Sequence, residues 1–379
     1  MRKILITAIT SLTLSASVAA AQGALSLQGL GYPPGALSAR AEGTGGGVAD
    51  FDALSLVAPA ALAGVGAAAL FLQYSPEFRK VTTSAGTANT TTARFPLVGG
   101  VIPMGQSWTL GFSSSTFLDR STETNLTRTE IVGSPTDTVT LNERNRVLGA
   151  INDVRLALAW SNSPKFRIGF GGHVFSGSNR STFSQIFPDS SKYISTSQTG
   201  RVSYAGFAAS VGVEIHPTRV LGFALAARKG GDLRAESGDT TLGSGRIPDH
   251  YSASVMFEGI PGAAISARVA HDSWSSLGSL SSSGIQAFDA WDAGAGIEAS
   301  GPRIMQRIIT LRVGARSRTL PFGFNGQKVS ENTLAAGLGI PLTRDRASFD
   351  FAVQRASRKA GSDISERGYI LSFGLRVSP

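Results

Sequence analysis

Apolar and polar residues alternate through the end of the chain, RGYILSFGLRVSP (367–379). Successive side chains of a strand point to opposite faces, so this period of two places the apolar residues on one face and the small or polar ones on the other. The same pattern recurs in DVRLALAW (153–160), TLRVGARSR (310–318) and SFDFAVQ (348–354). The chain is therefore predicted to be all-β, and the open question is whether protein or lipid covers the apolar faces.

Repeating the pattern search along the chain predicts about fourteen strands, an even number such as closed antiparallel barrels use. They are expected at 66–74, 92–102, 106–118, 146–160, 165–178, 200–215, 219–229, 247–258, 263–272, 286–298, 306–317, 331–340, 347–356 and 367–377. Short connections such as 161–164 and 216–219 alternate with long polar ones such as 121–143 and 178–199. Short turns at one end and long loops at the other are typical of transmembrane β-barrels.

The polar faces favour a barrel over a soluble β-sandwich, whose outer face would carry Lys, Glu and Thr. Here the polar positions are mostly Gly, Ala and Ser, interspersed with charges of both signs. In a confined lumen such charges need partners, because an unpaired buried charge is costly. We expect a lumen charge network of Asp153, Arg155, Arg167, Glu214, Arg228, Glu258, Arg268, Asp292, Glu298, Arg312, Arg316, Asp350 and Arg376.

The first residues carry an export signal. Arg2 and Lys3 precede the apolar stretch 4–14, and small residues at 19–21 offer a cleavage site, so residues 1–21 are predicted to be a signal peptide. Residues 22–65 are rich in Gly and Ala and lack the period of two. They are expected either to plug the lumen as a hatch or to form a loosely ordered tail. The predicted barrel occupies 66–379.

Composition narrows the alternatives. The chain has 42% hydrophobic and 16% charged residues, 45 glycines and no cysteine, which excludes a disulfide scaffold and cysteine metal sites. The formal net charge is +9, but the basic residues are dispersed singly, so nucleic-acid binding is not expected. After the apolar leader no apolar run is long enough for a transmembrane helix.

Catalysis and cofactors find little support in the sequence. There are four histidines, and Asp249-His250 and His271-Asp272 are adjacent pairs whose members point to opposite faces of a strand. No spacing typical of a metal site or of a nucleophile with its base is present. We therefore expect no enzyme activity, no metal and no cofactor.

Residues 39–62, ARAEGTGGGVADFDALSLVAPAAL, resemble the start of the FadL-type outer-membrane transporters of hydrophobic compounds. The family's Gly-rich stretch and Ala-Asp element correspond to Gly45, Gly46, Gly47 and Asp50. Its Asn-Pro-Ala motif corresponds to Ala58, Pro59 and Ala60, with Ala58 replacing the Asn. The resemblance implies a fourteen-stranded barrel with an N-terminal hatch in the lumen. It also implies passive uptake, with rearrangement of the hatch and lateral escape through a kinked strand.

The sequence therefore predicts a monomeric channel in the outer membrane of a Gram-negative bacterium, in contact with membrane lipids. Its ligand is expected to be a hydrophobic small molecule such as a long-chain fatty acid or an aromatic hydrocarbon. Two alternatives remain open: a barrel with a structural or secretion-accessory role, because a fold does not fix a function, and a general porin. The plug-like segment argues against the porin, whose lumen would be open.

Overall fold

The computed structural model describes residues 29–83, 86–131, 138–188, 193–280, 286–304, 307–323, 326–342, 346–361 and 364–379. The predicted signal peptide and residues 22–28 lie outside these ranges.

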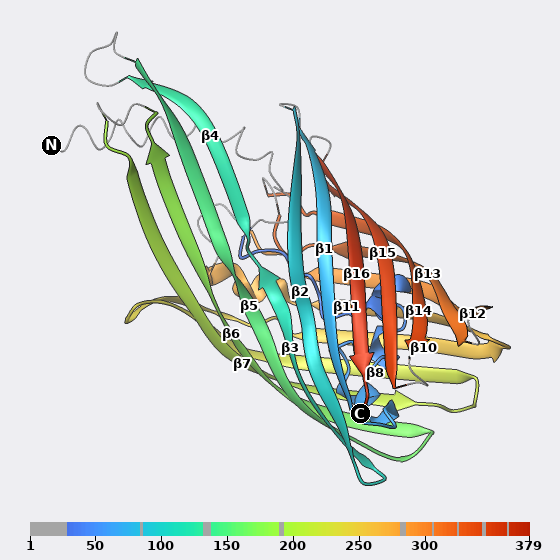
Figure 1. Cartoon of the computed structure of the whole chain (residues 1–379). Helices are drawn as coiled ribbons and strands as arrows, with labels where there is room; N and C mark the ends of the chain where they lie inside the picture. The colour runs from blue at the N-terminus through green and yellow to red at the C-terminus, as the bar shows by residue number, and fades with distance from the viewer. Residues whose placement is uncertain are drawn as a thin grey trace.

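Fourteen strands pair side by side and close into one antiparallel barrel, which confirms the predicted fold (Figure 1). Pairing of β1 with β16 joins the two ends of the strand sequence, and β8 pairs directly with β10, its neighbour in the ring. The strands of the ring are β1 Ala69–Thr83, β2 Gly86–Met104, β3 Trp108–Asp119, β5 Thr138–Ser163, β6 Phe166–Ile186, β7 Thr196–Ile215, β8 Leu221–Ser237, β10 His250–Ile260, β11 Ala263–Asp272, β12 Ala290–Ile304, β13 Arg307–Thr319, β14 Ser330–Leu342, β15 Ala347–Ala360 and β16 Ile364–Val377.

Two further strands extend the wall at the end opposite the short turns. β4 Thr122–Ile131 continues the edge of β3 and pairs with β5, whereas β9 Thr240–Arg246 forms a hairpin with β8. Much of the polar stretches 121–143 and 178–199 is thus strand, and the prediction of long loops there was wrong. Polar strands form there because pairing satisfies the backbone whatever the side chains are.

Over most of the ring, apolar side chains face outward and small or polar ones inward, the reverse of a soluble protein. On β8, for example, Phe223 and Leu225 are 44% and 58% exposed, whereas Ala224 and Ala226 are buried. Closure of the sheet pairs the backbone groups of the wall with neighbouring strands, as a lipid environment requires. Within the residues described, no helix is both long and apolar enough to cross a membrane.

Residues 29–65, called the N-terminal segment below, lie within the ring (Figure 1, dark blue). The segment contains the short helix α3 Ala39–Gly43 and two 3-10 turns, η2 Ala49–Phe51 and η3 Pro59–Gly64. Ser38 caps α3 by accepting a hydrogen bond from the Ala41 N–H, and Pro59 occupies the first turn of η3. A fourth short helix, η4 Trp274–Leu280, follows β11.

Candidate functional site

The N-terminal segment packs backbone to backbone against glycines of the wall. A Cβ atom added to Gly296 on β12 would lie 2.3 Å from the Thr44 carbonyl oxygen, and one added to Gly314 on β13 would lie 2.2 Å from the Thr44 carbonyl carbon. On the segment itself, Gly45 has a φ of +62° and a Cβ there would meet the Ala315 backbone at 2.5 Å. Glycine on both sides is therefore what allows this close approach.

A second glycine contact holds η3. A Cβ atom on Gly169 of β6 would lie 2.4 Å from the Pro59 carbonyl carbon, and one on Gly212 of β7 would lie 3.0 Å from Pro59 Cδ. Pro59 and Ala60 therefore rest on a different part of the wall from Gly45. Ala58, which replaces the family's Asn, precedes η3 without a side-chain cap.

Asp50 anchors the middle of the segment by its side chain. It is fully buried, and its carboxylate accepts hydrogen bonds from Ser252 and Ser254 of β10 at 3.1 and 2.5 Å. Arg268 of β11 lies 3.3 Å from the same carboxylate and supplies the opposite charge. A buried carboxylate with three donors is well satisfied.

The short turns are taken here as the lower end of the barrel. Tyr32 holds the start of the N-terminal segment at the upper part of the wall. Its ring lies within 5.2 Å of the guanidinium carbons of Arg94, Arg318 and Arg358, a distance typical of cation–π contacts. The Tyr32 hydroxyl donates to Glu331 at 3.1 Å and accepts from Arg318 and Arg358. One aromatic residue thus joins the segment to a buried cluster of arginines and acids.

The wall is incomplete between β2 and β3. Within the described ranges, β2 pairs with β3 only from Leu97 to Met104, and its upper part pairs with β1 alone. The upper parts of β2 and β4 diverge accordingly (Figure 1). A register shift in the β1–β2 pairing falls at Phe95–Pro96, where the gap begins.

Two contacts bridge this gap from the inside. The backbone of Tyr32 exchanges two hydrogen bonds of 2.8 Å with Asp119 at the end of β3, and Arg94 of β2 pairs with the Asp119 carboxylate. The N-terminal segment therefore serves as a short pairing partner for an edge of the wall that would otherwise be open.

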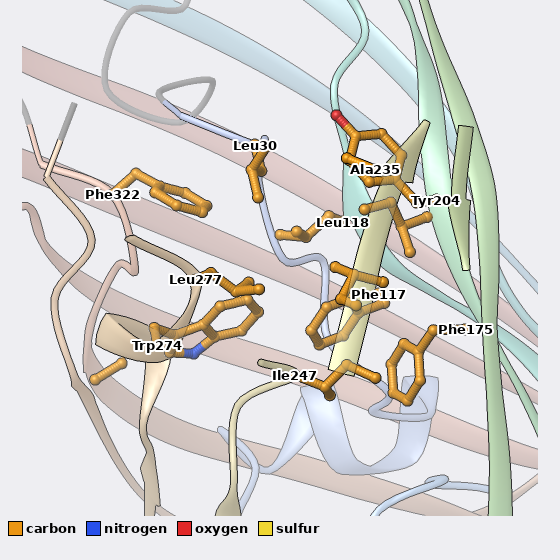
Figure 2. Packing of buried hydrophobic residues seen from close by; sticks show 13 residues of the cluster. Leu30, Phe117, Leu118, Phe175, Tyr204, Ala235, Ile247, Trp274, Leu277 and Phe322 are labelled. Carbon is orange, nitrogen blue, oxygen red and sulfur yellow. The ribbon is translucent and has the colours of Figure 1, made fainter. Parts of the chain in front are cut away.

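An aromatic and aliphatic cluster fills the upper lumen (Figure 2). Trp274 and Phe322 enter it from one side, and Phe117 and Phe175 from the other. The Phe117 ring stacks on Trp274 at 5.1 Å and meets Phe175 edge to face at 4.8 Å. Such a buried apolar layer inside a barrel offers a favourable surface to a hydrophobic solute.

The N-terminal segment separates two cavities. The upper one, of about 130 Å³, lies beneath the aromatic cluster and is lined by Phe117 and Trp274 and by Leu37 and Leu56 of the segment. The lower one, of about 810 Å³, opens near the short turns and is lined by Arg40 and other residues of the same segment. The segment thus lies between the two halves of the lumen.

Glu42 of α3 is buried and forms no ion pair with the residues that the structure describes. It accepts a hydrogen bond from Gln73 at 3.2 Å. Burial raises the pKa of the Glu42 carboxyl to about 7, and hydrogen bonds from Ser372 and Gln73 with the charges of Arg316 and Arg318 offset this only in part.

Most of the predicted lumen charges pair. Arg167 contacts Glu214 at 2.5 Å, and Arg316 contacts Asp292 at 2.6 Å. Arg312 joins Glu298 to Asp350, while Arg268 contacts both Asp50 and Asp292. Three predicted members, Arg155, Glu258 and Arg376, form no ion pair with any described residue, and Glu258 is exposed at the lower end of β10.

The structure also assembles groups that the sequence did not bring together. His173 of β6 contacts Asp153 of β5 through Nδ1 at 2.9 Å and Ser210 of β7 through Nε2 at 2.8 Å. This is the hydrogen-bond order of a nucleophile, a base and an orienting acid. Acyl transfer also needs donors for the oxyanion, and Ser210 lies mid-strand, where β6 and β8 pair on either side.

A second unforeseen pair joins His250 and Asp272, whose side chains meet at 2.8 Å across paired strands. Sequence reasoning considered each residue only with its chain neighbour. Among the described side chains, no group of three His, Asp or Glu residues is arranged to hold a metal ion.

The closed antiparallel barrel with an occupied lumen is similar to several solved barrel structures. A FadL homologue of Pseudomonas aeruginosa superposes with a TM-score of 0.65 at 12% identity, covering 92% of this chain and 99% of that one. The monoaromatic hydrocarbon channel CymD and the Pseudomonas putida toluene transporter TodX each give 0.57, at 13% and 12% identity, covering 91% of this chain and 98% of theirs. The chain therefore has the FadL-type fold, which confirms the resemblance seen in the sequence.

Two of these neighbours, CymD and TodX, are described as a channel and a transporter. No protein-family model and no curated protein matches the chain.

Proposed function

We propose that this protein is a channel of the Gram-negative outer membrane for passive uptake of hydrophobic small molecules such as long-chain fatty acids or aromatic hydrocarbons, acting as a monomer. The N-terminal segment is its hatch. The observation that carries the proposal is the position of this segment between an upper cavity under an aromatic cluster and a lower cavity at the short turns. A general porin would have no reason to fill its lumen in this way.

The contacts support a path for the solute. It would leave water for the aromatic cluster, because burial of apolar surface is favourable, and enter the upper cavity. Further movement requires either a shift of the N-terminal segment toward the lower cavity or passage through the gap between β2 and β3. Both routes involve the contacts of Tyr32, since it anchors the segment and also bridges the gap.

A reversible cross-link tests the hatch. A Cβ atom on Gly374 of β16 would lie 3.2 Å from the Ala39 Cβ, close to the separation that a disulfide requires, and the chain has no cysteine. The double variant Ala39→Cys/Gly374→Cys should therefore tie α3 to the wall under oxidation. When the double variant is oxidised, we expect uptake of labelled toluene and palmitate into liposomes to fall about ten-fold, because a fixed hatch cannot move out of the path. Reductant should restore uptake.

The single variants Ala39→Cys and Gly374→Cys are the matched controls and should respond to neither oxidant nor reductant. Equal uptake by the oxidised and reduced double variant would reject a mobile hatch. If no form of the protein raises uptake of either solute above that of protein-free liposomes, the barrel has a structural or accessory role instead.

A further inference from the structure

Four basic side chains gather on the outer surface of the wall, where β15, β16 and β1 lie side by side (Figure 1). They are Lys80 of β1, Arg355 and Lys359 of β15 and Arg367 of β16, and all four are exposed. Arg367 pairs in register with Lys80 on one side and with Ser357 on the other. Arg355 and Lys359 lie two positions to either side of Ser357, where their long side chains can reach Arg367. Three positive charges therefore surround the fourth.

The acids of the neighbouring strands that the structure describes do not offset these charges. Glu77, Glu331 and Glu366 are buried on the lumen face, where each of them contacts Arg358. None of the four basic side chains forms an ion pair or a hydrogen bond with a described residue. Like charges in neighbouring cross-strand positions repel, so an anion bound among them would be stabilised.

The height of this basic cluster matches that of lipid headgroups. Below Arg367, the outward positions of β16 are Tyr369, Leu371, Phe373, Leu375 and Val377. Arg367 lies ten positions above Val377, which at about 3.3 Å per residue and a strand tilt of ~40° is a rise of roughly 25 Å. The apolar band of a transmembrane barrel is about 25 Å tall. The basic cluster therefore stands at the upper edge of the band.

A groove on the outer wall adjoins the basic cluster. It has a volume of about 760 Å³, and Arg355, Lys359 and Arg367 line it at one end. From there it crosses a single row of cross-strand partners, which are Arg355, Leu334, Ala315, Ala295 and Ala267. Three alanines in one row leave a hollow in the outer surface that larger side chains would fill.

The row of alanines descends into the apolar band as it leaves the basic cluster. At one end, Arg355 pairs with Tyr369, which has the position of an aromatic girdle residue. On β12 the 60% exposed Trp291 has the same position, and Ala295 lies four places below it. A chain laid along the row would thus begin at the charges and end among hydrocarbon, as the tail of a membrane lipid does.

We propose that this outer groove binds a phosphate-bearing lipid of the surrounding leaflet. Arg367, Arg355 and Lys359 hold its phosphate, because guanidinium and ammonium groups are the usual phosphate donors in proteins. One acyl chain lies over Ala315 and Ala295. A free phosphate ion would satisfy the charges but leave the hollow unfilled. The site lies outside the barrel, so the inference does not depend on passage of a solute through the lumen.

The test titrates the full chain in detergent with diphosphoryl lipid A, a lipid with two phosphates, and measures the bound lipid by native mass spectrometry. Removal of both phosphates from the lipid should weaken binding by about ten-fold or more, because charge-assisted hydrogen bonds are lost. Arg367→Gln should have a similar effect. Lys229→Gln is the matched control, because Lys229 is also an exposed cation at the edge of the band but has Asp249 as its partner. It should bind the lipid as the wild type does.

A second variant tests the groove without changing its charge. Ala315→Phe fills the hollow from the lipid side of the wall and should also weaken binding of diphosphoryl lipid A by several-fold. Faster gel migration of unheated samples verifies that each variant is folded. Inorganic phosphate at millimolar concentration should not displace the lipid, since it cannot occupy the hollow.

Equal lipid affinity in the wild type, Arg367→Gln and Ala315→Phe would overturn the inference, as would equal binding of the dephosphorylated lipid. Complete displacement of the lipid by inorganic phosphate would overturn it as well and would make the basic cluster a site for free anions. The cross-link at Ala39 and Gly374 tests uptake separately, so rejection of the lipid site leaves the proposed channel function standing.

Discussion

Individual side chains decide how firmly the N-terminal segment is held, and they do so in different ways. Asp50 and Tyr32 are surrounded by cationic or hydroxyl donors and fix the segment at two points. Glu42, between those points, lies in a site that favours its neutral form. The same short segment therefore contains two strong anchors and one acid whose burial opposes its charge.

Glu42 makes docking of the segment dependent on pH. Its pKa of about 7 in the docked state exceeds its ordinary value of 4.5, so the stabilisation from neutral Glu42 is fully present below pH 4.5 and is lost as the pH rises through 7. Glu42→Gln mimics the neutral carboxyl and should hold the segment more firmly at pH 8, by about 2 kcal/mol, with little change at pH 4.

Hydrogen–deuterium exchange of residues 39–64 measures this difference. Wild type and Glu42→Gln are compared at the same pH, so the pH dependence of the intrinsic exchange rates cancels. A wild type and variant that exchange alike at pH 8 would show that Glu42 carries no charge penalty in the docked state.

Among the elements, the glycine faces of β12 and β13 show how the wall accommodates the segment. Gly296→Ala puts a methyl group 2.3 Å from the Thr44 carbonyl oxygen, so either the segment or the strand must move. We expect the barrel to form and the segment to detach locally, since overpacking costs about 1–3 kcal/mol and the segment is the less constrained partner.

Protease cleavage within residues 39–64 should accelerate in Gly296→Ala by several-fold. Gly172→Ala is the control, because nothing lies within 4 Å of its added Cβ. Cleavage that is equally fast in both variants would contradict a tight backbone contact at Thr44.

The period of two predicted the ring strands because one face of each is apolar, as in Phe349, Phe351 and Val353 of β15. It missed β4, whose sequence TETNLTRTEI is polar on both faces, since no apolar environment selects either side there. The lumen charges could be predicted as a set but not as pairs. The Asp50–Ser252 contact spans 202 positions, and Asp153, His173 and Ser210 come from three strands, so their meeting depends on strand register.

At the scale of the whole molecule, the barrel is inverted relative to a soluble protein, with charge inside and an apolar band outside. On β8 the band contains Phe223, Leu225 and Ala227, and it ends at the exposed Lys229, which pairs with Asp249. β9 lies beyond this band, because it pairs with β8 only above Gly231. Two similar leucines, Leu225 and Leu242, are thus 58% and 57% exposed but at different heights.

This difference provides a direct test of the surrounding lipid. Leu225→Arg places a charge in the middle of the apolar band and should lower the free energy of unfolding in bilayers by about 2–4 kcal/mol. Leu242→Arg should change it by less than about 1 kcal/mol, because the interfaces tolerate arginine. Urea titration of both variants in liposomes, followed by the heat-dependent gel shift, gives the two values. If the two substitutions cost the same, water rather than hydrocarbon surrounds Leu225, and the outward apolar face has some other partner.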